Sequence, residues 1–377
     1  MKKVRNVAMM IAMMMCVTPV MSCSEAQTDG DNNQNQDEDK PAVVNPTVKK
    51  YTNPVLKPGT FDGQNITSLA DPFVLKDDDG TYYMYVTGKG CHTFSSKDLV
   101  HWTYCGKAIP SYSWGKSAFW APEAFKYKGK YYLHYSSCEV SNGPKRIGLA
   151  VSDSPKGPFV DVAKTPFYTH EKDKGCIDSH FLFDDDGSIY MYYSLAASEN
   201  PADDTTGSLK NRSEIWVTAI KPDLSGPIEN TALMLTKPEQ SWEHDPTAAT
   251  YWNEGATVLK HDGKYYLMFS ANNYTKTVYA VGFATSDSPA GPFAKSDKNP
   301  VLTAANASGR VSGPGHNCVV ESPDGKELYC VYHSHVDLVE KGSVRMINID
   351  KLMFMPDGSL YVQGPSYNPK PMPSGCE

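Results

Sequence analysis

The chain has 377 residues, of which 40% are hydrophobic and 11% aromatic, so it can bury a large core. Its 23 tyrosines, its many glycines and prolines and the absence of long helical periodicity favour an all-β fold. The net charge of −7 is mild for this length, which excludes nucleic acid and acidic membrane surfaces as expected partners.

Residues 1–22 combine a basic start with an apolar run that is too short, and ends too abruptly, for a spanning helix. They are expected to be a signal peptide. The residues VMSC that end at Cys23 resemble a bacterial lipobox. We therefore expect Cys23 to carry the lipid anchor of an outer-membrane lipoprotein, at the cell surface or facing the periplasm. An ordinary cleaved signal, in which Cys23 has no such role, is the alternative.

Residues 23–50 contain the tract SEAQTDGDNNQNQDEDK, which is polar, acidic and free of aromatic residues. Such a composition cannot bury enough apolar surface to fold. We therefore expect a flexible tether, followed by one folded domain over residues 51–365 and a C-terminal tail over residues 366–377.

A hairpin pattern recurs five times in the folded part. In the fourth copy, Glu254–Ser270, the apolar runs ATVLK and KYYLMF are joined by His261, Asp262 and Gly263, which is a strong signal for a β-hairpin. The other copies turn at Gly80, Gly129, Gly187 and Gly325. One hairpin about every 50–75 residues is typical of a β-propeller. The chain is therefore predicted to form a single five-bladed β-propeller without a C-terminal β-sandwich.

The residues nine positions before the five turn glycines are chemically distinctive. They are Asp71, Trp120, Asp178, Glu254 and His316. Equivalent positions of propeller blades converge on the axis, so these side chains are expected to form one ring. Singly, each has a plainer interpretation, since such carboxylates begin strands, cap turns or pair with cations, and a lone histidine is usually structural. The shared register favours a functional site.

Of the 9 cysteines, seven follow Cys23, an odd number that cannot pair completely within one chain. Cys318 and Cys330 could face each other across the last hairpin, but small buried thiols are an equally good interpretation. No disulfide is predicted.

Several motifs resemble glycoside hydrolase family 43, a group of five-bladed propeller enzymes. They are DPF, WAPE, IDSH, EGA, GPGHN and YHSH, in this order over about residues 51–364. The resemblance implies an inverting hydrolase of arabinose- or xylose-containing plant glycans. Matched position by position, Asp71 would be the general base, Glu254 the general acid, and Asp178 the carboxylate that tunes the acid and orients the sugar. The motif EGA departs from the EGP that is frequent in the family, which affects backbone shape more than chemistry.

The resemblance also extends to residues around the carboxylates. His316 is expected to bind substrate. It also matches an axial histidine that in many relatives contacts a central ion or its waters, so a calcium ion on the propeller axis is allowed, although no cofactor is required. Arg345 matches a substrate-binding arginine. Trp120 and Trp252, with Trp114 as a further candidate, could stack against the apolar face of a sugar.

The favoured function is an exo-α-L-arabinofuranosidase that acts as a monomer on arabinan or arabinoxylan. An endo-α-1,5-L-arabinanase and a β-xylosidase are alternatives, although many xylosidases of the family carry a C-terminal β-sandwich. The alternative of another class is a surface glycan-binding propeller without catalysis. Three carboxylates count against it, because a binding protein has no use for an acid and a base around one bond.

Overall fold

The computed structural model describes residues 48–170, 174–196, 212–338 and 342–376. The predicted signal peptide, the predicted lipidation residue Cys23 and most of the predicted tether lie outside the described residues. In the described part, no helix is both long and apolar enough to cross a membrane.

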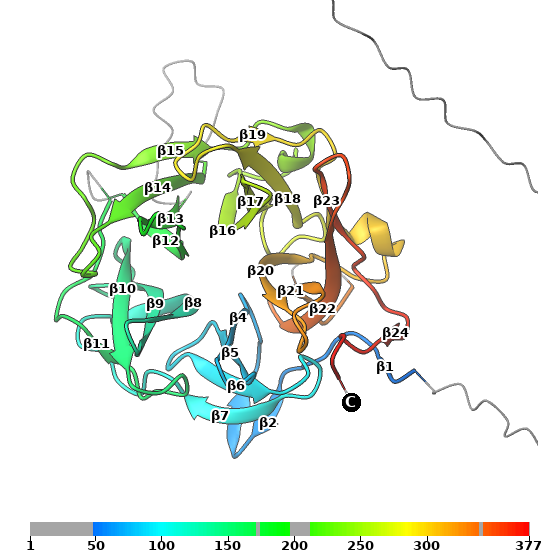
Figure 1. Cartoon of the computed structure of the whole chain (residues 1–377), viewed down its shortest axis with the longest axis horizontal. Helices are drawn as coiled ribbons and strands as arrows, with labels where there is room; N and C mark the ends of the chain where they lie inside the picture. The colour runs from blue at the N-terminus through cyan, green and yellow to red at the C-terminus, as the bar shows by residue number, and fades with distance from the viewer. Residues whose placement is uncertain (1–47, 171–173, 197–211, 339–341, 377) are drawn as a thin grey trace, which may run out of the picture. The chain divides into compact units, whose positions relative to one another are not determined.

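Five four-stranded antiparallel sheets form the blades of a propeller, which confirms the predicted fold class (Figure 1). Blade 1 contains β4 (Phe73–Lys76), β5 (Tyr82–Val86), β6 (His92–Ser96) and β7 (Thr103–Lys107). Blade 2 contains β8 (Ser117–Tyr127), β9 (Lys130–Cys138), β10 (Lys145–Ser152) and β11 (Val160–Asp161). Blade 3 contains β12 (Cys176–Phe183), β13 (Ile189–Leu195), β14 (Glu214–Ile220) and β15 (Leu233–Thr236).

The last two blades have the same strand order. Blade 4 contains β16 (Asn253–His261), β17 (Lys264–Ala271), β18 (Ala280–Ser286) and β19 (Ala294–Lys295). Blade 5 contains β20 (Gly315–Glu321), β21 (Leu328–His335), β22 (Arg345–Phe354) and β23 (Leu360–Val362). Each predicted hairpin thus supplies the first two strands of a blade. In blade 4 the hairpin turns at Asp262 and Gly263, whose positive φ angles of 47° and 76° fit a type I′ turn.

The core consists of apolar clusters between neighbouring blades. Strand β17 shows how the sequence produces it, because successive side chains of a strand point to opposite faces. Tyr266 and Met268 pack against Tyr332 of blade 5, whereas Leu267 packs in a cluster with Tyr192 of blade 3. A middle strand is therefore buried on both faces, which explains its nearly continuous apolar run.

The N-terminal segment joins the last blade to the first. Asn53 donates a hydrogen bond from Nδ2 to the carbonyl oxygen of Ile349 at 2.8 Å and accepts one from the Ile349 N–H at 3.0 Å. β1 (Lys50–Tyr51) pairs with β24 (Lys370–Pro371), and β2 (Gly59–Phe61) pairs with β3 (Gln64–Ile66). The described part of the predicted C-terminal tail thus packs beside the start of the folded unit.

All seven cysteines in the described part of the chain are free thiols. Cys318 stands opposite Val331, and Cys330 stands opposite Val319. Both are fully buried among apolar side chains, which agrees with their interpretation as small buried hydrophobic residues.

Candidate active site

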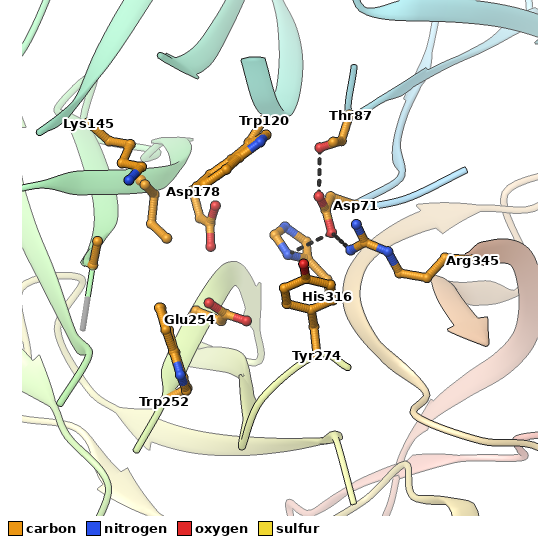
Figure 2. A pocket seen from close by; sticks show the side chains of 12 residues that line it. Asp71, Thr87, Trp120, Lys145, Asp178, Trp252, Glu254, Tyr274, His316 and Arg345 are labelled. Carbon is orange, nitrogen blue, oxygen red and sulfur yellow. Dashed lines mark hydrogen bonds and ion pairs between the residues drawn. The ribbon is translucent and has the colours of Figure 1, made fainter. Parts of the chain in front are cut away.

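One cavity of about 190 Å³ gathers residues from all five blades (Figure 2). It is lined by Asp71, Thr87, Trp120, Lys145, Ile177, Asp178, Ala196, Trp252, Glu254, Tyr274, His316 and Arg345. The lining includes seven residues predicted from the sequence as catalytic or substrate-binding: Asp71, Asp178, Glu254, Trp120, Trp252, Arg345 and His316. The structure therefore brings together side chains that are as much as 274 positions apart in the sequence.

Each blade has a residue in the left-handed region at or near the start of its inner strand, here called the bulge residue. In blades 2 to 5 the pairing of the first two strands shifts register at this residue. In blades 1, 3 and 5 that residue is Asp71 (φ 51°), Asp178 (φ 54°) or His316 (φ 49°). Aspartate and histidine are among the few side chains enriched in this conformation. The bulges re-aim the side chains, as bulges beside active sites commonly do. Aspartate and histidine are thus suited both to the left-handed backbone conformation and to a polar site.

The expectation that all five ring residues share one register is wrong in blades 2 and 4. Their hairpins turn with two residues, whereas the hairpins of blades 1, 3 and 5 have longer turns. In these two blades, the residue nine positions before the turn glycine therefore lies one position before the bulge residue. In these two blades the bulge residues are Ala121 (φ 43°) and Gly255 (φ 61°), and Trp120 and Glu254 directly precede them. Both side chains still line the cavity.

Asp71 is held as a carboxylate by its neighbours. Arg345 Nη1 donates to Oδ1 at 3.0 Å, and the Thr87 hydroxyl donates to Oδ2 at 2.6 Å. His316 Nδ1 lies 3.4 Å from Oδ1. Burial alone would raise the pKa of Asp71, but the Arg345 guanidinium and the His316 imidazole hold that pKa well below its ordinary value of 3.8.

Asp178 and Glu254 form the second part of the site, and Figure 2 shows their carboxyl groups pointing toward one another. Both side chains are buried, and burial raises the pKa of Glu254 to about 8. The Tyr279 hydroxyl donates a hydrogen bond of 2.9 Å to Glu254, which has the opposite effect and lowers this pKa. Burial also raises the pKa of Asp178 to about 8, and the Glu254 charge adds to this effect. Both carboxyl groups therefore hold a proton more readily than exposed carboxyl groups do.

Aromatic side chains form part of the cavity wall. Trp120 is 39% exposed, and Lys145 Nζ lies 5.2 Å from the centre of its ring. The Arg345 guanidinium lies 4.5 Å from the centre of the Tyr274 ring. The further candidate Trp114 does not reach the cavity. It is 5% exposed and stacks on Tyr135 between blades 1 and 2.

Residues that support the carboxylates escaped the sequence analysis. Thr87, Lys145, Tyr274 and Tyr279 lie outside the hairpin register and carry no distinctive motif. His333 stands within YHSH, which was the available signal. It accepts the Asp71 backbone N–H at Nδ1 over 3.2 Å, and burial lowers its pKa to about 3, so this imidazole is neutral.

The residues around His316 form a poor ligand set for an ion. Within the described residues, no group of three or more His, Cys, Asp or Glu side chains is arranged to hold a metal. A calcium ion needs 6–8 oxygen ligands, whereas His316 offers an imidazole whose Nδ1 is engaged with Asp71. An ion at this histidine stays a prediction, and no chemistry is assigned to it.

Comparisons with known proteins find similar sequences and similar structures. A family profile described as glycosyl hydrolases family 43 matches residues 22–360. A thermostable family-43 glycoside hydrolase of known structure superposes with a TM-score of 0.77 at 38% identity, covering 86% of this chain and 100% of that one. The Aspergillus niger protein named beta-D-galactofuranosidase xynD is 29% identical over 286 residues, 71% of this chain and 72% of its own length. An extracellular exo-alpha-(1->5)-L-arabinofuranosidase of Streptomyces chartreusis is 27% identical over 301 residues, 74% of this chain and 83% of its own.

Proposed function

The chain belongs to family 43 of the glycosyl hydrolases, and we propose that it is an inverting exo-α-L-arabinofuranosidase acting on plant arabinan or arabinoxylan. One observation carries the proposal: a single cavity is lined by Asp71, whose pKa is lowered, and by Asp178 and Glu254, whose pKa values burial raises. Inverting hydrolysis needs a carboxylate that activates water and a carboxylic acid that protonates the leaving oxygen from the other side of the sugar.

Glu254 is proposed as the general acid. Its carboxyl group keeps a proton near neutral pH because it is buried and because the negative charge of Asp71 disfavours its ionised form. The Tyr279 hydroxyl contacts Oε1, which orients the carboxyl group. Glu254 would give its proton to the glycosidic oxygen as the bond breaks, and Asp178, then ionised, would stabilise the positive charge that develops on the sugar ring.

Asp71 is proposed as the general base. The Arg345 contact keeps it ionised at every working pH, and the Thr87 hydroxyl fixes its second oxygen. In this form it can accept a proton from a water molecule that attacks the anomeric carbon. Arg345 would hold the base in place and contact the sugar, and Trp120 and Trp252 would stack against the sugar's apolar face.

The size of the cavity supports action at a chain end. At about 190 Å³ it is smaller than the roughly 300–1,000 Å³ of pockets that enclose drug-sized ligands. It therefore suits one monosaccharide better than a stretch of polysaccharide. The relatives named above include an arabinofuranosidase and a galactofuranosidase, both named for furanose sugars, which supports arabinofuranose over xylopyranose.

A panel of substrates tests the sugar and the mode of action. We expect p-nitrophenol release from the α-L-arabinofuranoside well above release from the β-D-xyloside or the β-D-galactofuranoside, and free arabinose as the first product from linear arabinan. Oligosaccharides as first products would indicate an endo-arabinanase, and preference for the xyloside a xylosidase. Binding of arabinan without turnover of any substrate would indicate a glycan-binding propeller.

The site also predicts the pH dependence. Catalysis needs an ionised Asp71, and the lowered pKa of Asp71 keeps it ionised down to strongly acidic pH. Catalysis also needs the proton of the Asp178 and Glu254 pair, which is lost as the pH rises past about 8. We expect kcat/KM to be flat through mildly acidic and neutral pH and to fall on the alkaline side. In Tyr279→Phe, loss of the hydrogen bond that lowers the Glu254 pKa should move this alkaline limb upward. A downward shift would contradict the assignment.

We also propose that catalysis requires no metal ion. Arg345, rather than a cation on the axis, neutralises Asp71. Exhaustive dialysis against EDTA is therefore expected to leave kcat/KM unchanged. A loss that added calcium reverses, and that His316→Ala abolishes, would instead place an ion at His316.

The location of the protein is a further part of the proposal. Cys23 would carry a lipid that anchors a monomer to the outer membrane, with an acidic tether before the propeller. The S. chartreusis relative is named extracellular, which agrees with export. Labelled palmitate should be incorporated into the wild-type protein and not into Cys23→Ala. Equal labelling of both, or of neither, would contradict the anchor.

A further inference from the structure

Equivalent hydrogen bonds connect neighbouring blades around the site. In each blade, one residue in or directly after the second strand pairs with the residue that precedes the bulge residue. These side chains are Thr87, Ser136, Ser194, Ser270 and His333. The equivalent position thus carries an acceptor of hydrogen bonds in all five blades, and each of these side chains except the half-buried Thr87 is fully buried.

At four joints this side chain accepts the backbone N–H of the bulge residue in the next blade. Thr87 Oγ1 accepts from Ala121 at 2.7 Å, and His333 Nδ1 accepts from Asp71 at 3.2 Å. Two further pairs complete the pattern: Ser136 Oγ with Asp178 N–H at 3.0 Å, and Ser270 Oγ with His316 N–H at 2.7 Å. Four bulge residues, including both aspartates of the site, are thus fixed by the preceding blade.

The joint between blades 3 and 4 breaks the pattern. Ser194 Oγ is buried and has no hydrogen-bond partner among the described residues. The N–H of Gly255, which the repeat would direct to Ser194, makes no hydrogen bond to that hydroxyl. Gly255 has a φ of 61°, and a Cβ there would lie 3.2 Å from the His316 ring, so glycine suits this crowded position.

We propose that Ser136 positions Asp178 from the preceding blade, through the hydrogen bond that it accepts from the Asp178 backbone N–H. The inference rests on the proposed roles of Asp178 and Glu254. The hydrogen bond fixes the bulge that carries the Asp178 side chain, and the position of that carboxyl group sets how strongly it acts on the proton of Glu254. Ser136 acts through Asp178 and is a positioning residue.

Two serines at equivalent positions provide a matched test. Ser136→Ala leaves the buried Asp178 N–H without an acceptor, and the aspartate can move relative to Glu254. We expect kcat to fall by about 10–100-fold with little change in KM, since small displacements of catalytic groups have effects of this order. Ser194→Ala removes a hydroxyl without a partner, so kcat, KM and the melting temperature should not fall. Ser136→Thr, which keeps a hydroxyl, should recover most of the lost activity.

The pH profile separates positioning from a general loss of stability. The titratable groups around Asp178 are Glu254, His316 and Asp71, and none of them is changed in these variants. A displaced Asp178 carboxyl group should interact differently with Glu254, so the alkaline limb of kcat/KM should move in Ser136→Ala and stay in place in Ser194→Ala. Equal losses in both variants, or a lower melting temperature in Ser136→Ala with an unmoved limb, would overturn the proposal.

The assay uses whichever glycoside the wild-type protein cleaves fastest, so a different sugar specificity leaves this test intact. Glu254→Gln is measured beside the serine variants. If Glu254→Gln keeps full turnover, the proposed acid is wrong and with it the proposed function. If Glu254→Gln is inactive while the two serine variants behave alike, only the positioning inference fails.

Discussion

Glu254→Gln is expected to lower kcat on arabinan by about 10²–10⁴-fold, because the amide cannot donate the proton that the leaving oxygen needs. The change is nearly isosteric and keeps an acceptor for the Tyr279 hydroxyl. Substrate binding should therefore be largely intact. The measurement is kcat on arabino-oligosaccharides, with binding followed by calorimetry on the inactive variant.

The leaving group provides the control. An aryl arabinofuranoside with a highly acidic phenol needs little protonation, so Glu254→Gln should lose far less activity on it than on arabinan. A loss of equal size on both substrates would show that Glu254 does something other than protonate the leaving oxygen. Unimpaired turnover of arabinan would remove Glu254 as the acid.

Asp71→Asn is expected to lower kcat by about 10²–10⁴-fold on both kinds of substrate, because water activation is needed whatever the leaving group. The variant should also be less stable. It leaves the Arg345 guanidinium, whose side chain is only 12% exposed, without its ion-pair partner. Breaking a buried pair in this way costs about 3–5 kcal/mol.

Thermal unfolding distinguishes these two effects of Asp71→Asn. A folded variant with a lowered melting temperature and no activity on the aryl substrate agrees with a base held by Arg345. Azide, as a nucleophile that needs no base, should restore turnover of that substrate. Substantial activity of the folded variant without azide would exclude Asp71 as the base.

The fold and the convergence of the site could be predicted because the propeller repeats one hairpin. Asp71, Asp178 and His316 occupy equivalent left-handed positions in three blades, so a constant distance from the turn glycine located them correctly. The same count was one residue early in blade 2 and blade 4. The turn glycine measures position along the strand only when the turns have equal length, and Gly263 closes a turn of two residues.

Supporting residues were harder to predict because their roles arise from contacts between blades. Ser136 and Ser194 occupy the same position in the second strands of neighbouring blades, yet only Ser136 accepts a backbone N–H. Spacing alone cannot separate them. Trp114 shows the opposite error, since a tryptophan in a long polar loop was expected to meet sugar and instead packs between two blades.

The stereochemistry of the released sugar tests the central claim most directly, namely that Asp71 and Glu254 act on opposite faces of one sugar. Proton NMR of a fresh reaction on an α-L-arabinofuranoside should show β-arabinofuranose as the first product, with the α anomer appearing only as the sugar mutarotates. Initial release of the α anomer would mean retention, and would contradict the assignment of Asp71 as a base that activates water.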